Sequence, residues 1–118
     1  MPDPVFEVLK AIIQPYAGRL AVAVDTHDSY CLNTARPGTG RRPQRFGAVQ
    51  VRKSYVSFHL IPVYIFPELL ANLSPALRAR MQGKSCFNFR RVPDVDIQQE
   101  LARLVAHGID RFAAEGLM

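Results

Sequence analysis

The sequence predicts an α+β fold in which an N-terminal and a C-terminal helix pack on one face of an antiparallel sheet. Apolar residues recur at helical spacing near both ends of the chain, and apolar and polar residues alternate in short segments between them. These segments follow one another through short turns, and short turns join antiparallel strands. We therefore expect a sheet of about five strands, with a short helix pair before the last strand.

Length and composition narrow the class of protein. A chain of 118 residues, 48% apolar and 21% charged, has the size and composition of one globular domain, here 1–118. No apolar run approaches the ~18 residues of a membrane span, no secretory signal is visible, and two cysteines are too few for a disulfide framework. We expect a cytoplasmic protein, and we predict no cofactor.

The N-terminal helix is predicted by its first residues. Asp3 can accept hydrogen bonds from the free amides of a first helical turn, and Pro4 has no amide that would need a partner there. One stripe of this helix is apolar and comprises Val5, Leu9, Ile12 and Tyr16. Pro15 should end the helix near Gln14, because a proline ring clashes with the preceding turn.

A first hairpin and a loop are expected next. Residues 20–24 and 30–34 alternate in polarity on either side of a polar turn. A basic surface loop, rich in glycine and proline, follows at 35–45, because such a composition does not suit the interior of an element.

A second hairpin is predicted over residues 46–60. A turn centred on Arg52 and Lys53 would pair Val49 with Val56. Since side chains alternate along a strand, this register also decides which residues share a face.

The C-terminal half begins with the short helix pair. Residues 66–70 open one helix, and residues 74–83 form a second one that ends at a glycine suited to a left-handed stop. Residues 85–90 alternate as the last strand. Asp96, with Gln99 three residues on, fits a capping box and begins a C-terminal helix of about 18 residues.

The strand pattern predicts two different faces of the sheet. The apolar face should lie against the long helices and collects Leu20, Val22, Val24, Leu32, Val49, Val56, Phe58, Leu60, Phe87 and Phe89. The opposite face collects Ala21, Ala23, Cys31, Asn33, Gln50, Tyr55, Ser57, His59, Cys86, Asn88 and Arg90. An antiparallel sheet often leaves such a face in water, and the same small and polar side chains would also suit a shallow cleft.

Basic residues are concentrated in the middle of the chain. The formal net charge is +5, but residues 29–93 hold eleven basic residues and one acidic residue, and the flanks hold four basic and nine acidic residues. A folded chain segregated in this way can carry a positive surface that attracts anions. Arginine-rich surfaces also occur without a specific ligand.

Two small constellations carry residue types that could do chemistry. Cys86 and His59 would act as nucleophile and base if folding joined them with an orienting third group, although a buried, inert cysteine is the more common case. Asp25, His27 and Asp28 have metal-ligating side chains in one turn, where the same residue types are ordinary turn formers.

The basic loop carries a further alternative. Its arginines could contact phosphates and give nonspecific association with nucleic acid: Arg36, Arg41, Arg42 and Arg45. The glycines of this loop lack the Gly-Lys-Ser/Thr element of a P-loop, and no helix-turn-helix or aromatic RNA-binding signature is present.

Two runs carry a family resemblance: KSYVSFHL at 53–60, followed by Pro62 and Tyr64, and MQGKSCFNF at 81–89. Together they resemble the YdhG-like bacterial family, domain-of-unknown-function family 1801. That family is distantly related to frataxin-like iron chaperones, which implies a sheet flanked by helices and metal delivery without catalysis. The resemblance emphasises Lys53, Tyr55, Ser57, His59, Gln82, Lys84, Ser85, Cys86 and Asn88.

The favoured interpretation is a non-enzymatic binding domain whose polar sheet face holds a small anionic ligand or a segment of a protein partner. The expected ligand-binding residues are Lys53, Tyr55, Ser57, His59, Lys84, Cys86, Asn88 and Arg90. Nonspecific nucleic-acid association and frataxin-like iron handling are the alternatives. We expect no membrane partner, and either a monomer or a homodimer, since a polar sheet face can also form a dimer contact.

Overall fold

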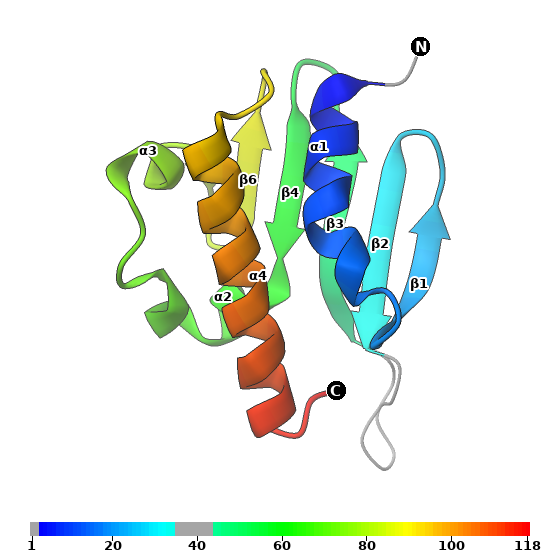
Figure 1. The fold of residues 1–118 in the computed structure, drawn as a ribbon, viewed down its shortest axis with the longest axis vertical. Coiled ribbons are helices and arrows are strands. Elements are labelled where there is room, and N and C mark those ends of the chain that lie inside the picture. The colour runs from blue at the N-terminus through cyan, green and yellow to red at the C-terminus, as the bar shows by residue number, and fades with distance from the viewer. Residues whose placement is uncertain (1–2, 35–43) are drawn as a thin grey trace.

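A computed structural model describes residues 3–34 and 44–118 of the chain. Within these residues the strands are β1 (Leu20–Asp25), β2 (Ser29–Thr34), β3 (Arg45–Val51), β4 (Val56–Leu60), β5 (Met81–Gln82) and β6 (Cys86–Phe89). They form one antiparallel sheet in the order β1-β2-β3-β4-β6-β5, and helices α1 (Pro4–Ile13) and α4 (Val95–Ala114) cover one of its faces (Figure 1). The predicted α+β class is confirmed, with one strand more than expected.

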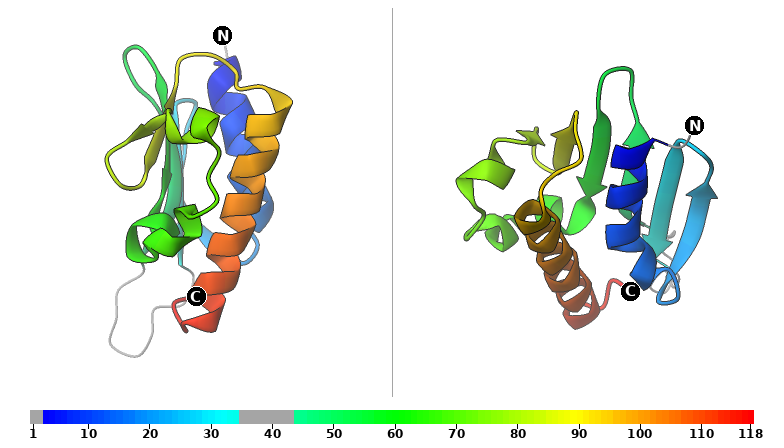
Figure 2. Two further views of the ribbon diagram at one scale, coloured as in Figure 1. Left: turned by 90° about the vertical axis from the view of Figure 1, so that its left-hand side faces the viewer. Right: turned by 45° about the horizontal axis from the view of Figure 1, so that its top comes forward.

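The molecule has two layers. Turned on its side, it shows α1 and α4 on one side of the sheet, and no helix among the described residues covers the other side (Figure 2). No helix in the described part of the chain is long and apolar enough to cross a membrane.

Both long helices begin at an aspartate. Asp3 Oδ1 accepts hydrogen bonds from the Val5 amide at 2.9 Å and the Phe6 amide at 3.2 Å, as predicted, and a 3-10 turn containing Pro15 follows α1. The N-cap of α4 is Asp94, which accepts from the Ile97 amide at 3.0 Å. The expected capping box at Asp96 is wrong, because that residue already lies in the first turn of the helix.

The short helices differ from the expected pair. They are α2 (Ile61–Ile65), the 3-10 helix η2 (Pro67–Leu70) and α3 (Pro75–Arg78). Helix α3 ends at Arg78 rather than at Gly83, and the chain then forms β5. Gly83 does adopt the left-handed conformation, with φ of +74°, but it serves the turn between β5 and β6.

The β3–β4 hairpin is two residues out of the predicted register. Val49 pairs with Phe58, and Val51 pairs with Val56. The turn therefore contains four residues, closed by the Arg52 amide donating to the Tyr55 carbonyl oxygen at 2.8 Å. A shift of two residues leaves the paired side chains of Gly47–Val51 and Val56–Leu60 on their predicted faces, because the period along a strand is two.

Two bulges change the alternation. In β1, Val22 pairs with Leu32 but Val24 pairs with Cys31, so Ala23 is an extra residue and Val24 joins the polar face, contrary to expectation. Val22 keeps its predicted face but lies at the sheet edge and is 48% exposed.

The second bulge, in β3, adds Phe46 to the core. Leu32 pairs with Gly47 and Asn33 pairs with Arg45, which leaves Phe46 between them. The Phe46 ring meets the edge of the Phe112 ring of α4, with 5.5 Å between centroids. Strict alternation along β3, without the bulge, would place Phe46 on the polar face of the sheet.

The core lies between the apolar sheet face and the long helices. The sheet contributes fully buried side chains at Leu32, Phe58, Leu60 and Phe87, and the helices contribute Leu9, Ile13, Leu101, Val105 and Phe112. Each such side chain stabilises the fold by roughly 1.5–3 kcal/mol through burial. This packing fixes the opposite sheet face as the one available for a site.

Candidate functional site

The sheet face that no helix covers, here called the open face, carries two rows of side chains across the strands. Cross-strand pairing builds the first row from Val24, Cys31, Ala48, His59, Cys86 and Gln82. The second row comprises Ser29, Gln50, Ser57 and Asn88. Residues paired across strands share a face, so the register joins side chains that are far apart in the sequence.

A hydrogen-bonded chain joins two side chains of the first row, His59 and Cys86, to Ser85 in the turn before β6. His59 Nδ1 is 3.4 Å from Cys86 Sγ, and His59 Nε2 is 2.9 Å from Ser85 Oγ. The β4–β6 pairing sets the first contact, and the Leu60 amide, which donates to the Ser85 carbonyl oxygen at 2.9 Å, sets the second. Sequence reasoning named Cys86 and His59 but could not place them in contact, nor find Ser85 as their third member.

The electrostatics of His59 favour its neutral form. Burial lowers the pKa of His59 below its ordinary value, and the positive charge of Arg45 on β3 lowers it further. A neutral imidazole donates from one ring nitrogen and accepts at the other. In the tautomer that carries its proton on Nε2, the ring donates to the Ser85 hydroxyl, and Nδ1 can accept the proton of the Cys86 thiol.

A hollow of about 660 Å³ opens beside the two rows. Its lining comprises Tyr55, Ala79, Arg80, Met81, Gln82, Asn88 and Arg90. The Asn88 amide donates to the Arg80 carbonyl oxygen at 2.8 Å, which ties Arg80 to the edge of β6. Across the parts of the chain that the structure describes, neither Arg80 nor Arg90 forms an ion pair.

The residues predicted to bind ligand separate into three groups. Tyr55, Asn88 and Arg90 line the hollow, and Ser57, His59 and Cys86 lie in the rows next to it. Lys84 lines a different hollow, and Lys53 lines a neighbouring one that shares Tyr55 and Arg90 with this hollow.

Arg80 was missed as a ligand-binding residue, and Gln82 was indicated only by the family resemblance. Both lie in or beside β5, which the sequence pattern had assigned to a helix. Strand β5 has only two residues, too few to show an alternating pattern in the sequence, so no strand signal marked Arg80 and Gln82.

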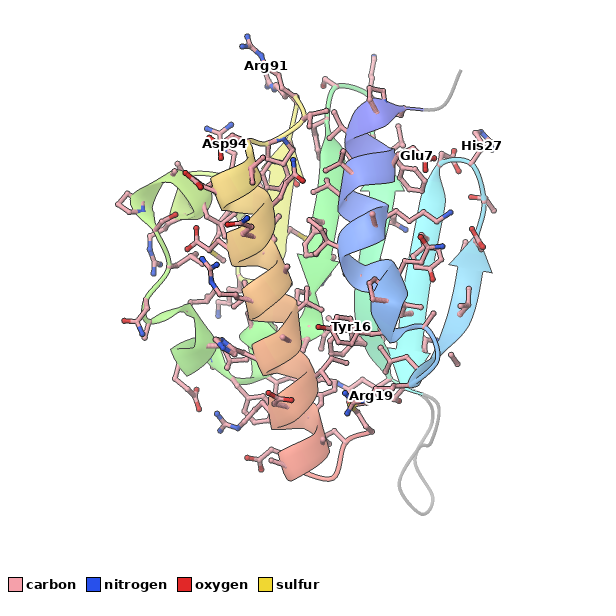
Figure 3. All side chains as sticks on the ribbon, in the orientation of Figure 1. Glu7, Tyr16, Arg19, His27, Arg91 and Asp94 are labelled. Atoms are coloured by element: carbon pink, nitrogen blue, oxygen red, sulfur yellow. The ribbon has the colours of Figure 1, made fainter. Side chains whose placement is uncertain are left out.

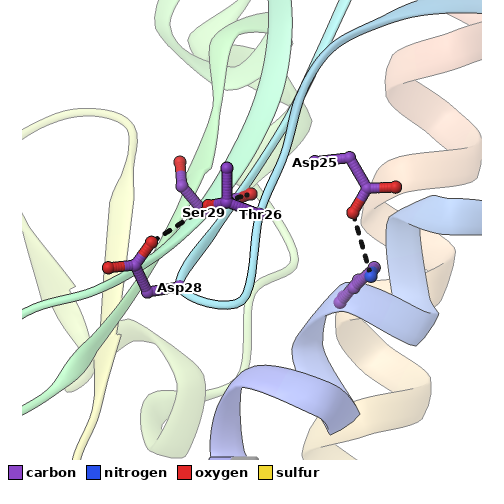
Figure 4. A network of polar contacts seen from close by, with 5 residues as sticks. Asp25, Thr26, Asp28 and Ser29 are labelled. Carbon is purple, nitrogen blue, oxygen red and sulfur yellow. Dashed lines mark hydrogen bonds and ion pairs between the residues drawn. The ribbon is translucent and has the colours of Figure 1, made fainter.

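The predicted metal ligands do not converge. Asp25 accepts from Lys10 Nζ at 3.3 Å and Asp28 from Thr26 Oγ1 at 3.0 Å, on opposite sides of the hairpin (Figure 4). His27 extends from the tip of this hairpin (Figure 3) and is exposed. Among residues 3–34 and 44–118, no group of three or more histidine, cysteine, aspartate or glutamate side chains could hold a metal ion.

The basic loop is described only at its end. Arg36, Arg41 and Arg42 lie outside the described residues, whereas Arg45, predicted to belong to the loop, is the first residue of β3. Arg91, another arginine of the basic middle segment, projects away from the body of the molecule just before α4 begins (Figure 3).

Two other hollows have different linings. One of about 160 Å³ lies between η2 and α4, but the carboxylate of its Glu100 already accepts hydrogen bonds from the amide and hydroxyl of Ser74, at 2.7 and 2.6 Å. Another, of about 570 Å³, is lined mainly by apolar side chains, including Val63 and Tyr64. Neither offers two unpaired guanidinium groups.

Comparison of the chain with protein-family models, with curated proteins and with solved structures found no match. The resemblance to the YdhG-like family therefore stays a prediction. Any function has to be argued from the geometry and charge of the site itself.

Proposed function

We propose that this protein is a binding domain whose open face holds a small anionic ligand in the hollow between β5, β6 and the β3–β4 turn. One observation carries the proposal: Arg80 and Arg90 line the same hollow, and neither is neutralised by a carboxylate of the described residues. A ligand bearing a carboxylate or a phosphate would supply the missing negative charge.

The chemistry of the lining suits such a ligand. A guanidinium group donates two parallel hydrogen bonds to a carboxylate or phosphate and stays charged at all ordinary pH values. The amides of Gln82 and Asn88 and the hydroxyl of Tyr55 add donors that can fix its orientation. The volume of about 660 Å³ is in the range of about 300–1,000 Å³ found for small-molecule sites.

Thermal unfolding in low salt tests the proposal, with citrate and pyrophosphate as the carboxylate and phosphate probes. An anion at about 100 times its Kd should add about 2.7 kcal/mol to the free energy of unfolding. Arg80→Gln and Arg90→Gln should each reduce this gain. Arg19→Gln removes the same charge from an exposed position between the 3-10 turn at Pro15 and β1, and it should leave the gain intact.

Two results would contradict the proposal. One is the absence of any stabilisation by either probe. The other is an equal loss in all three variants, since that pattern would show a general response to net charge rather than a site. A gain with only one probe would decide between carboxylate and phosphate ligands.

A further inference from the structure

Anion binding uses Arg80 and Arg90 but gives no role to the chain of Cys86, His59 and Ser85. Of these three residues, Cys86 is the neighbour of the hollow, although it does not line it. Cys86 pairs across the strands with Gln82 and precedes Asn88 by two residues on the same face, and both of these neighbours line the hollow. A ligand that contacts Gln82 and Asn88 would therefore be bound by the residues that flank Cys86 on the open face.

We propose that Cys86 is a nucleophilic thiol, with His59 as its general base, that forms a covalent bond with small carboxylate-bearing carbon electrophiles held in the hollow. Ser85 is a positioning residue, which holds the His59 ring through Nε2. The preference for an anionic electrophile rests on the proposed function, whereas the reactivity of the thiol itself does not.

The bond-forming step uses only Cys86, His59 and the electrophile. A lone pair of Cys86 Sγ forms a bond to the electrophilic carbon while the thiol proton passes to His59 Nδ1, 3.4 Å away. With iodoacetate as the electrophile, the C–I bond breaks and iodide leaves with its electron pair. His59 then releases the proton to water and returns to its neutral form.

The surroundings of His59 favour a neutral base over a standing ion pair with the thiolate. Arg45 of β3 is the charged group that acts on the ring, and its positive charge opposes protonation. From β6 and the turn before it, the hydrogen-bond partners of the ring are the thiol of Cys86 and the hydroxyl of Ser85. Within the described ranges, no carboxylate is hydrogen-bonded to His59 to stabilise an imidazolium.

The other cysteine supplies a control inside the same molecule. Cys31 lies in the same row but is only 1% exposed, and its nearest polar contact is the hydroxyl of Ser29 at 3.8 Å. No histidine is in hydrogen-bond contact with it among the described residues. Because Cys31 differs from Cys86 both in its burial and in having no histidine partner, its rate gives the baseline for a buried thiol of this fold, and His59→Gln isolates the contribution of the histidine.

The test measures second-order alkylation rates of each cysteine by mass spectrometry, with iodoacetamide and iodoacetate at low salt. At pH 7, Cys86 should react with iodoacetamide at least about tenfold faster than the model thiol N-acetylcysteinamide. His59→Gln should remove this advantage at pH 7. The iodoacetate-to-iodoacetamide ratio should exceed that of the model thiol and fall in Arg90→Gln.

The outcomes separate the two proposals. A fast, His59-dependent reaction without preference for iodoacetate supports the nucleophile and contradicts the anion site. Reaction of Cys86 at the model rate, or an unchanged rate in folded His59→Gln, overturns the nucleophile. If His59→Gln does not fold, the wild-type pH profile decides. A thiol without a base loses about tenfold in rate per pH unit below its pKa, whereas a base-assisted thiol keeps its rate until His59 is protonated.

Discussion

Truncating Phe58 to alanine tests the packing that leaves the open face free. Phe58 is fully buried in the central strand β4, where it pairs with Val49 of β3 and Phe87 of β6. Both neighbouring strands are held in place by the ladder, so the cavity left by the ring can collapse only in part. A buried Phe→Ala change then costs about 3–5 kcal/mol, of a total stability of about 5–15 kcal/mol.

Urea unfolding followed by circular dichroism measures this loss, with Val22→Ala as the control. Val22 points to the same face but lies on the edge strand and is 48% exposed, so its truncation should cost less than about 1 kcal/mol. For a chain of this size, the Phe58 variant should also melt about 12–20 °C lower. A loss below about 1 kcal/mol in Phe58→Ala would refute the assignment of the two faces.

Two further predictions concern a helix end and a titration. Asp94→Ala should lower the free energy of unfolding by about 1 kcal/mol and Asp96→Ala by clearly less, because only Asp94 accepts a hydrogen bond from a first-turn amide of α4. Denaturant unfolding of the two variants measures both losses. A larger loss in Asp96→Ala than in Asp94→Ala would contradict the prediction. The pKa of His59 is lower in the folded protein than its value of about 6.5 in the unfolded chain. At acid pH the unfolded chain therefore binds a proton at this histidine more readily than the folded protein does. The free energy of unfolding should fall as the pH drops from about 7.5 through 6.5 towards the folded pKa. That part of the pH dependence should be absent in His59→Gln, and an identical profile would contradict the burial of the ring.

The faces of the sheet could be predicted from the sequence because side chains alternate with a period of two. An error of two residues in the strand register therefore leaves each paired side chain on the same face. The true register of the β3–β4 hairpin pairs Val49 with Phe58 rather than with Val56, yet the side chains of the paired residues stay on their predicted faces. Bulges are different, since one extra residue inverts the alternation beyond it. Nothing in the pattern around Ala23 or Phe46 signals the extra residue, so Val24 and Phe46 could not be placed.

The candidate site depends on pairing between strands that are far apart in the sequence. Polar alternation placed His59 and Cys86 on one face, but their contact requires the β4–β6 register, and the helix pair intervenes between these strands. Ser85 joins them from the turn before β6, where side-chain direction does not follow from strand parity. Arg80 was missed for a related reason, because a strand of two residues is too short to show a period.

The location of the anion is the most direct test of the whole account. If an anion binds in the hollow of the open face, an amide-resolved NMR titration with citrate in low salt should show the largest chemical-shift changes at Tyr55, Gln82 and Asn88. Changes centred instead on Leu73 and His107, in the hollow between η2 and α4, or no saturable change at all, would contradict it.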